Sequence, residues 1–142
     1  MSKSAMPTAV HLLFIRGDKI LMLRRAHTGY QDGNYSLVAG HHEDGESLTH
    51  TAVREAKEEA GVDIEPQNLS LKVLVHKKEA DERIAVFFAV HHWSGEIQNM
   101  EPDKCDDLSW FALDNLPSNT IPYIRAALDA LRNNKIYVEF GW

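Results

Sequence analysis

The stretch that decides the fold runs from Gly40 to Val62 and reads GHHEDGESLTHTAVREAKEEAGV. Its second half predicts a helix over residues 47–60, in which Ser47 is a suitable N-cap and Gly61 a suitable C-terminal stop. Small and apolar side chains recur at helical spacing along one face of this helix, namely Leu48, Ala52, Ala56 and Ala60. We expect that face to be buried against the rest of the protein.

Three glutamates, Glu55, Glu58 and Glu59, border this apolar face within an arc of roughly 100°. Negative charge in the last turn of a helix is disfavoured by ~0.3–1 kcal/mol per residue, and the like-charged neighbours add to this. A solvated charged face would alternate acids with bases four residues apart, but Arg54 and Glu58 form the one such pair. The pattern therefore favours a carboxylate cluster for a hard divalent cation, Mg²⁺ or Mn²⁺.

Seven residues of the stretch stand at the spacing of the Nudix box, G-x5-E-x7-R-E-U-x-E-E-x-G-U, where U is apolar: Gly40, Glu46, Arg54, Glu55, Glu58, Glu59 and Gly61. Ala56 and Val62 fill the two U positions. A chance match has odds on the order of 10⁻⁸ to 10⁻⁹ per register. The chain therefore resembles a Nudix hydrolase over nearly its whole length. The resemblance implies an α/β/α sandwich with a mixed β-sheet between helices.

The resemblance also implies where the metal binds. Glu58 and Glu59 would be its ligands, and Glu55 would be either a ligand or the base that acts on the attacking water. Family members commonly enter the box with Leu-Pro-Gly-Gly, whereas this chain has Leu37-Val38-Ala39-Gly40. The position of Ala39 often supplies a backbone carbonyl to the metal, and alanine retains that carbonyl.

The remaining box residues have supporting roles by the same resemblance. Arg54 would orient the glutamates through charge-assisted hydrogen bonds. Glu46 would brace the loop before the helix. Gly40 and Gly61 would be structural, the first for close backbone approach and the second for helix termination.

A further acidic ligand is expected from outside the box, because one helix face cannot surround an ion. The candidates are Glu101, Asp103, Asp106 and Asp107. Asp106 is chosen on spacing, since it stands just before a strand predicted near residues 108–111.

Composition narrows the class of protein. With 142 residues the chain has the length of a single domain, taken as residues 1–142. Fifteen basic and 21 acidic residues give a net charge of −6, which disfavours binding to duplex nucleic acid. The single Cys105 excludes an internal disulfide, and neither a signal-peptide core nor a membrane-spanning run is present. A cytoplasmic protein is expected.

The rest of the chain predicts strands interleaved with helices, which is an α/β or α+β arrangement with helices on both faces of the sheet. Gly17-Asp18 predicts a type II′ hairpin turn between the first two strands, and residues 26–36 read as a loop. Strands are predicted over residues 10–15, 19–24, 69–76, 83–93 and 108–111, and a second helix over 120–132.

The resemblance implies Mg²⁺-dependent cleavage of a pyrophosphate bond in a nucleoside diphosphate derivative, with Mn²⁺ as an alternative metal. A (deoxy)nucleoside triphosphate, cleaved to the monophosphate and pyrophosphate, is the leading substrate. ADP-ribose or another nucleotide sugar is the enzymatic alternative, and a non-catalytic nucleotide-binding module is the alternative of a different class. Which nucleotide binds, which residues bind it, and whether the protein is a monomer or a homodimer stay open.

Overall fold

The computed structural model describes residues 2–142, which form a mixed β-sheet with a helix on each side. The strands are β1 (Thr8–Arg16), β2 (Lys19–Arg25), β3 (Tyr35–Ser36), β4 (Val38–His41), β5 (Leu69–Lys78), β6 (Glu82–Val90), β7 (Cys105–Ala112) and β8 (Tyr137–Phe140). The helices are α1 (Leu48–Glu55), its π-helical continuation η1 (Ala56–Ala60), the 3₁₀ turn η2 (Pro66–Asn68) and α2 (Pro122–Arg132).

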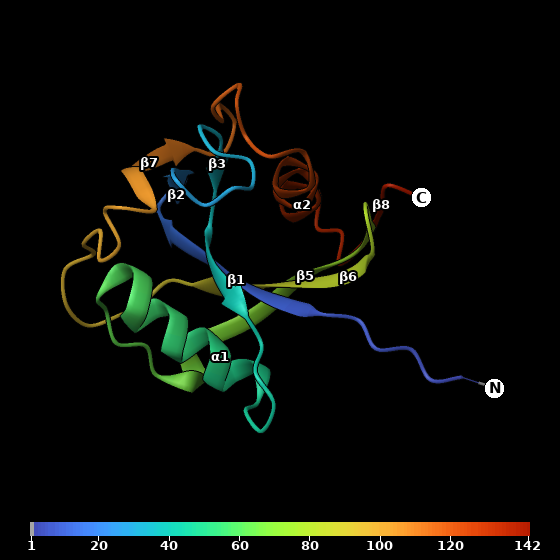
Figure 1. Ribbon diagram of the computed structural model, residues 1–142. Coiled ribbons are helices and arrows are strands. Elements are labelled where there is room, and N and C mark those ends of the chain that lie inside the picture. Colours follow the sequence, from blue (N-terminus) through green and yellow to red (C-terminus); the bar gives the residue numbers. More distant parts are fainter. Residues whose placement is uncertain (1) are drawn as a thin grey trace.

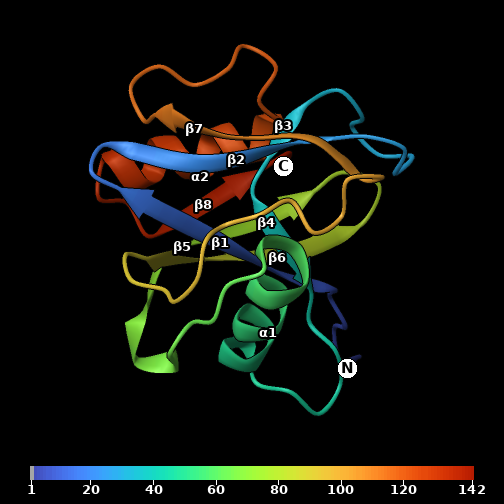
Figure 2. The ribbon, with the colours of Figure 1, turned by 90° about the vertical axis from the view of Figure 1, so that its left-hand side faces the viewer.

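Strand β1 supplies side chains to both faces of the sheet, because successive side chains in a strand point to opposite sides. Val10, Leu12 and Phe14 pack with the small residues of α1 and η1, whereas Leu13 packs with α2. Figure 1 shows α1 below the central strands and α2 above them, and Figure 2 shows the same two layers from the side. The predicted α/β/α layering is therefore confirmed.

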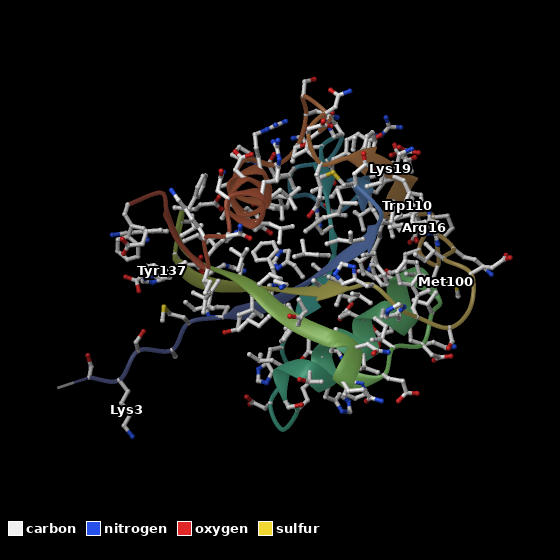
Figure 3. The ribbon with its side chains drawn as sticks, turned by 180° about the vertical axis from the view of Figure 1, so that it is seen from behind. Lys3, Arg16, Lys19, Met100, Trp110 and Tyr137 are labelled. Atoms are coloured by element: carbon white, nitrogen blue, oxygen red, sulfur yellow. The ribbon has the colours of Figure 1, made fainter. Side chains whose placement is uncertain are left out.

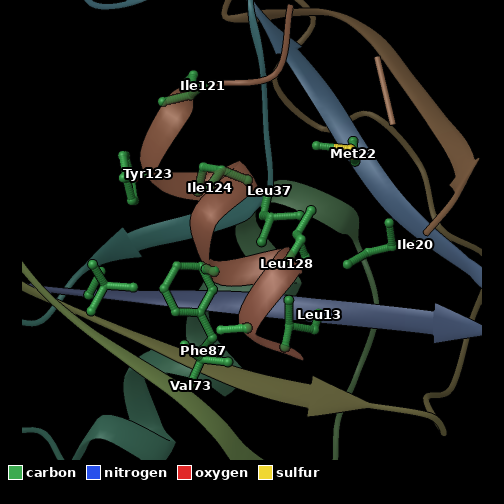
Figure 4. Close-up of a cluster of buried hydrophobic side chains, with 14 of the residues drawn as sticks. Leu13, Ile20, Met22, Leu37, Val73, Phe87, Ile121, Tyr123, Ile124 and Leu128 are labelled. Atoms are coloured by element: carbon green, nitrogen blue, oxygen red, sulfur yellow. The ribbon is translucent and has the colours of Figure 1, made fainter. Parts of the chain in front are cut away.

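The core on the α2 side is the larger of the two. Its helix packs Ile124 and Leu128 against Leu13, Phe87 and the neighbouring strands, as Figure 4 shows. These helix positions have the 3.6-residue spacing from which the helix was predicted, so its burial follows directly from the sequence pattern.

The sheet divides beside β1. One edge of β1 pairs in parallel with β6 along residues 8–14. Its other edge pairs with β4 through residues 9–12, but with β2 only through Ile15 and Arg16. Strands β4 and β2 therefore leave β1 at different points, and the space between them opens toward the functional cleft described below.

The hairpin turn predicted at residues 17 and 18 is confirmed. Gly17 has a φ of 63° and Asp18 has no positive φ, as a type II′ turn requires, and the two-residue loop pairs Arg16 with Lys19. The end of the sheet beside this turn is capped by Arg16, whose guanidinium lies 4.6 Å from the centre of the Trp110 ring (Figure 3).

Other boundaries differ from the prediction. The strand predicted over 83–93 ends at Val90, and the strand predicted from 108 begins at Cys105 because its early residues pair with Arg24 and Arg25 of β2. The short strands β3, β4 and β8 were not predicted, since pairing partners and not their own sequences define them. The helices within the described residues are too short and too polar to span a bilayer.

Candidate active-site cleft

A cleft of about 970 Å³ opens beside the box helix and reaches through the division in the sheet. One end lies on the α1 side and is lined by glutamates; we call it the acidic end and define it by Glu55, Glu58, Glu59 and Glu101. The other end reaches the α2 side; we call it the distal end and define it by His11, Lys77 and Tyr123. The volume is within the usual range for small-molecule sites.

The box helix is held at both termini as the sequence predicts. The Ser47 hydroxyl accepts a hydrogen bond from the His50 N–H at 3.0 Å, and Gly61 ends the helix with a left-handed φ of 71°. The last turn, however, is π-helical and not α-helical, with the Gly61 N–H bonded to the carbonyls of Ala56 and Lys57. Such turns are rare and are frequent at functional sites. This one carries Glu58 and Glu59.

Gly40 and Glu55 are packed against one another. A Cβ atom at position 40 would stand 1.9 Å from the Glu55 Cδ atom, so any side chain at this position would displace the carboxyl group. Glu55 is only 7% exposed as a result. The box glycine is therefore required for space and not for backbone conformation, since its φ is not positive.

Arg54 lies at the centre of the acidic residues. Its Nη1 donates to Glu55 Oε1 at 2.7 Å and to Glu58 Oε2 at 3.4 Å. Its Nε and Nη2 donate to the two oxygens of Glu46 at 3.2 and 2.8 Å, and Nη2 also donates to the His41 carbonyl at 3.1 Å. One guanidinium thus joins the loop before the helix to two of the cleft glutamates.

Glu46 is fixed on every side. Besides Arg54, it accepts hydrogen bonds from the Thr51 hydroxyl at 2.8 Å and from the Glu43 N–H at 3.0 Å. These donors, Arg54 above all, lower the pKa of Glu46 to about 2, so the group stays ionised. Thr51 is fully buried and was not identified from the sequence, where only its position on the helix could have indicated it.

The cleft glutamates have the opposite electrostatic character. Burial, strengthened by the neighbouring charge of Glu55, raises the pKa of Glu59 to about 8. Burial also raises the pKa of Glu55. Both groups therefore carry their negative charge at a disadvantage that a nearby cation would remove.

Ala39 borders the same glutamates. Its N–H donates to Glu59 Oε2 at 3.3 Å and therefore points away from β1. In an extended strand the N–H and carbonyl of one residue point to the same side, so the Ala39 carbonyl also lies toward the helix.

Asp106, the acid chosen on spacing, lies away from the cleft. The Asp106 carboxylate pairs with Arg24 at 2.7 Å on an exposed surface and does not line the cleft. Glu101 does line it, and its charge is close enough to raise the pKa of both Glu55 and Glu59. The choice of Asp106 is thus not supported by its position, because the pairing of β7 with β2 brings Asp106 beside Arg24.

The donor set suits Mg²⁺ without forming a closed cage. Among residues 2–142, no three acidic, histidine or cysteine side chains already stand together as a metal-binding group. Mg²⁺ usually takes one or two carboxylates and leaves its other positions to water and substrate phosphates. Carboxylates with raised pKa values on one wall of an open cleft fit that mode of binding.

The distal end was not predicted from the sequence. The Nε2 atom of His11 and the hydroxyl of Tyr123 share a hydrogen bond of 2.9 Å, and the Lys77 ammonium lies 3.7 Å from the centre of the Tyr123 ring. His11 occurs in an otherwise apolar run, which is the one signal in the sequence that could have drawn attention to it.

Comparison with known proteins gives a consistent family. Residues 5–131 match the NUDIX domain family. Among solved structures, the protein is similar to a MutT NUDIX hydrolase from Burkholderia pseudomallei, with a TM-score of 0.81 and 27% identity over 89% of this chain and 98% of that one.

Among curated proteins, the chain is similar to the NAD-capped RNA hydrolase NudC of Stutzerimonas stutzeri, with 34% identity over 107 residues. That match covers 75% of this chain and 37% of the relative. The NudC of Pseudomonas aeruginosa is 36% identical over 106 residues, again 75% of this chain and 36% of the relative. The chain therefore spans little more than a third of the length of these relatives.

Proposed function

The chain belongs to the Nudix family, and on that basis we propose that it is a hydrolase that cleaves a pyrophosphate bond in a nucleoside diphosphate derivative, with Mg²⁺ as its metal. The observation that carries the proposal is the contact of Arg54 with Glu46, Glu55 and Glu58, which holds box carboxylates at the wall of a cleft large enough for a nucleotide.

Four groups would hold the metal: the carboxylates of Glu58, Glu59 and Glu101, and the carbonyl of Ala39. When bound there, a divalent cation would neutralise charge on the phosphoryl oxygens and lower the pKa of a water. The acidic end alone would repel a polyphosphate, so the substrate is expected to bind together with the metal.

Glu55 is the proposed general base. Its Oε1 is held by Arg54, which leaves Oε2 to take a proton from the attacking water. The raised pKa of Glu55 favours this role, because a carboxylate of ordinary pKa is a weak base at neutral pH. Arg54 and Glu46 are positioning residues that keep Glu55 against Gly40.

A (deoxy)nucleoside triphosphate is the proposed substrate class, and a dinucleotide is the second candidate. The second is favoured by the relatives named as NAD-capped RNA hydrolases and by a cleft of about 970 Å³ that extends to both faces of the sheet. Nucleotide sugars such as ADP-ribose belong to the same test.

The test is a screen with Mg²⁺ that follows pyrophosphate release from nucleoside triphosphates and, by chromatography, the formation of nucleoside monophosphate from nucleotide sugars and dinucleotides. Turnover of at least one class, lost on removal of the metal by a chelator, is expected. Absence of turnover throughout the panel, in protein shown to be folded, would favour the non-catalytic binding module instead.

A further inference from the structure

Lys77 is a buried cation held in a loose ion pair. The residue is 7% exposed, and its nearest carboxylate, Glu79, lies 3.8 Å from the ammonium nitrogen, beyond hydrogen-bond distance. Lysine is almost never buried to this degree unless it is paired. Burial accordingly lowers the pKa of Lys77. Lys77 lines the cleft, where its ammonium can still donate to a ligand.

Tyr123 fixes the position of this ammonium. The ring lies beneath it at 3.7 Å, a distance at which a cation is attracted to an aromatic face. The Tyr123 hydroxyl is itself held by His11, whose ring stacks on Phe87 with centroids 4.3 Å apart. Lys77 is thereby set on a rigid aromatic support.

His11 is a polar residue within the hydrophobic core. It is 1% exposed, and among residues 2–142 its Nδ1 has no hydrogen-bond partner. Burial lowers the pKa of His11 to about 3, so the ring is neutral. A buried nitrogen without a partner is unfavourable, and a hydrocarbon side chain would avoid it. The histidine is therefore best explained by the hydroxyl that it holds.

From this arrangement we propose that Lys77 is a specificity-determining residue that donates a hydrogen bond to a carbonyl oxygen on the substrate's base. The inference rests on the proposed function, which places the diphosphate at the acidic end of the cleft. The group joined to the diphosphate then extends toward the distal end, where Lys77 is a buried donor. An ammonium has three donors and no acceptor, so it selects an acceptor.

Hypoxanthine and adenine form a matched pair for this selection. Hypoxanthine carries a carbonyl oxygen at the ring position where adenine carries an amino group, and the ribose and phosphates are identical. An amino group opposite Lys77 would place donor against donor and offer the ammonium no acceptor at that ring position. Inosine triphosphate should therefore be a better substrate than adenosine triphosphate.

The test compares kcat/KM for the two triphosphates in the wild type and in two variants. Lys77→Met keeps the length of the side chain but removes its donors, and it removes a charge that burial disfavours, so the fold should persist. Lys78→Met is the matched control, because Lys78 is the next residue of β5, is exposed, and also lies over an aromatic ring, that of Trp142.

The wild type should prefer inosine triphosphate by about tenfold or more, which is roughly 1.4 kcal/mol of barrier. In Lys77→Met the kcat/KM values for the two triphosphates should lie within about twofold of each other. Lys78→Met should retain the wild-type preference. A wild-type preference near one, or a preference retained in Lys77→Met, would overturn the inference. An equal loss of kcat/KM for both triphosphates in Lys77→Met would show that the ammonium binds phosphate instead.

Calorimetric titration of the wild type and variants with the two nucleoside monophosphates, without metal, separates this inference from the proposed function. Tighter binding of inosine than of adenosine monophosphate, lost in Lys77→Met, would support the role of Lys77 even if no substrate were hydrolysed. Equal binding of both monophosphates by the wild type would refute it even if the enzyme were active, and this result does not depend on the folding of any variant.

Discussion

The two ends of the cleft are built in different ways. Most of the acidic end comes from one continuous stretch, in which Gly40, Arg54 and Glu55 contact each other directly or through neighbours. At the distal end, His11 and Tyr123 are 112 positions apart and meet only in the folded protein. The residues of the proposed reaction are thus encoded locally, whereas the part proposed to recognise the base is assembled by the tertiary structure.

The two ends also differ in the sign of the charge that burial disfavours. At the acidic end burial raises the pKa of Glu55 and Glu59, and at the distal end it lowers the pKa of His11 and Lys77. Before a ligand binds, the charged forms of the residues at each end are therefore disfavoured. A ligand with a cation at one end and a hydrogen-bond acceptor at the other complements both.

The largest expected effect belongs to the acidic end. Glu58→Gln and Glu59→Gln should each lower turnover about 100-fold, roughly 2.7 kcal/mol of barrier, because an amide keeps the volume and loses the charge. The stability of the metal-free protein should hold or rise slightly, since repulsion in the last helical turn is relieved. Steady-state kinetics and urea unfolding measure the two quantities. The exposed Glu96→Gln serves as control, and normal activity in both test variants would show these acids to be surface charge.

Gly40→Ala should disturb the same end through packing alone. The added methyl group would overlap Glu55, at an expected loss of about 1–3 kcal/mol of unfolding free energy and with displacement of the proposed base. Combining it with Glu55→Ala should recover stability but not activity, and urea unfolding of the four proteins in a double-mutant cycle measures the coupling. Additive effects would mean that the two residues do not obstruct one another.

The acid outside the box should have a smaller effect on activity. Its identity determines which residues belong to the acidic end. Glu101→Gln should lower kcat/KM about tenfold, roughly 1.4 kcal/mol, whereas Asp106→Asn should be nearly as active as the wild type. Asp106 pairs with Arg24 at the surface, and exposed pairs contribute about 0–1 kcal/mol to stability. The opposite ranking in steady-state assays would restore Asp106 as the ligand and move Glu101 out of the site.

The smallest effect is on the pH dependence of stability, and it probes the distal end. The pKa of His11 falls from 6.5 in the unfolded chain to about 3, so the unfolded state binds more protons between these values. His11 therefore makes stability decline as the pH falls from about 6.5, with a slope of at most ~1.4 kcal/mol per pH unit, whereas the raised pKa values of Glu55 and Glu59 act in the opposite direction. In urea unfolding at pH 5 and 7, acidification should be less destabilising for His11→Phe than for the wild type, and the exposed His92→Phe should match the wild type. Equal slopes in wild type and His11→Phe would assign the effect to other groups.

The features predicted correctly from the sequence are those that depend on residues close to each other in the chain. Ser47 and Gly61 act on backbone groups three or four residues away, and Gly17 determines a turn between adjacent strands, so local patterns suffice for all three. The apolar stripe of α1 likewise needs only helical spacing. The family resemblance named the box residues in advance because they form one continuous motif.

Sequence patterns could not determine the features that depend on pairing with a distant strand. Which acid of residues 101–107 faces the cleft depends on how β7 pairs with β2, and that pairing places Asp106 beside Arg24. Strand β4 contains Ala39 and Gly40, which have little preference for strands, and it exists because β1 pairs with it. The role of His11 could not be predicted for the same reason, because it depends on a hydrogen-bond partner that is distant in the sequence.

The position of His11 within the core also bears on how such a protein can change through evolution. Its ring stacks on Phe87, in the layer that packs α2 onto the sheet. A substitution that altered the proposed base recognition through His11 would therefore also destabilise the domain, and most proteins have little stability in reserve. New substrate preferences should arise first at residues such as Tyr30 and Arg83, which line the cleft outside that layer. Changes at His11 should follow only in lineages that have already acquired compensating mutations in the α2 core.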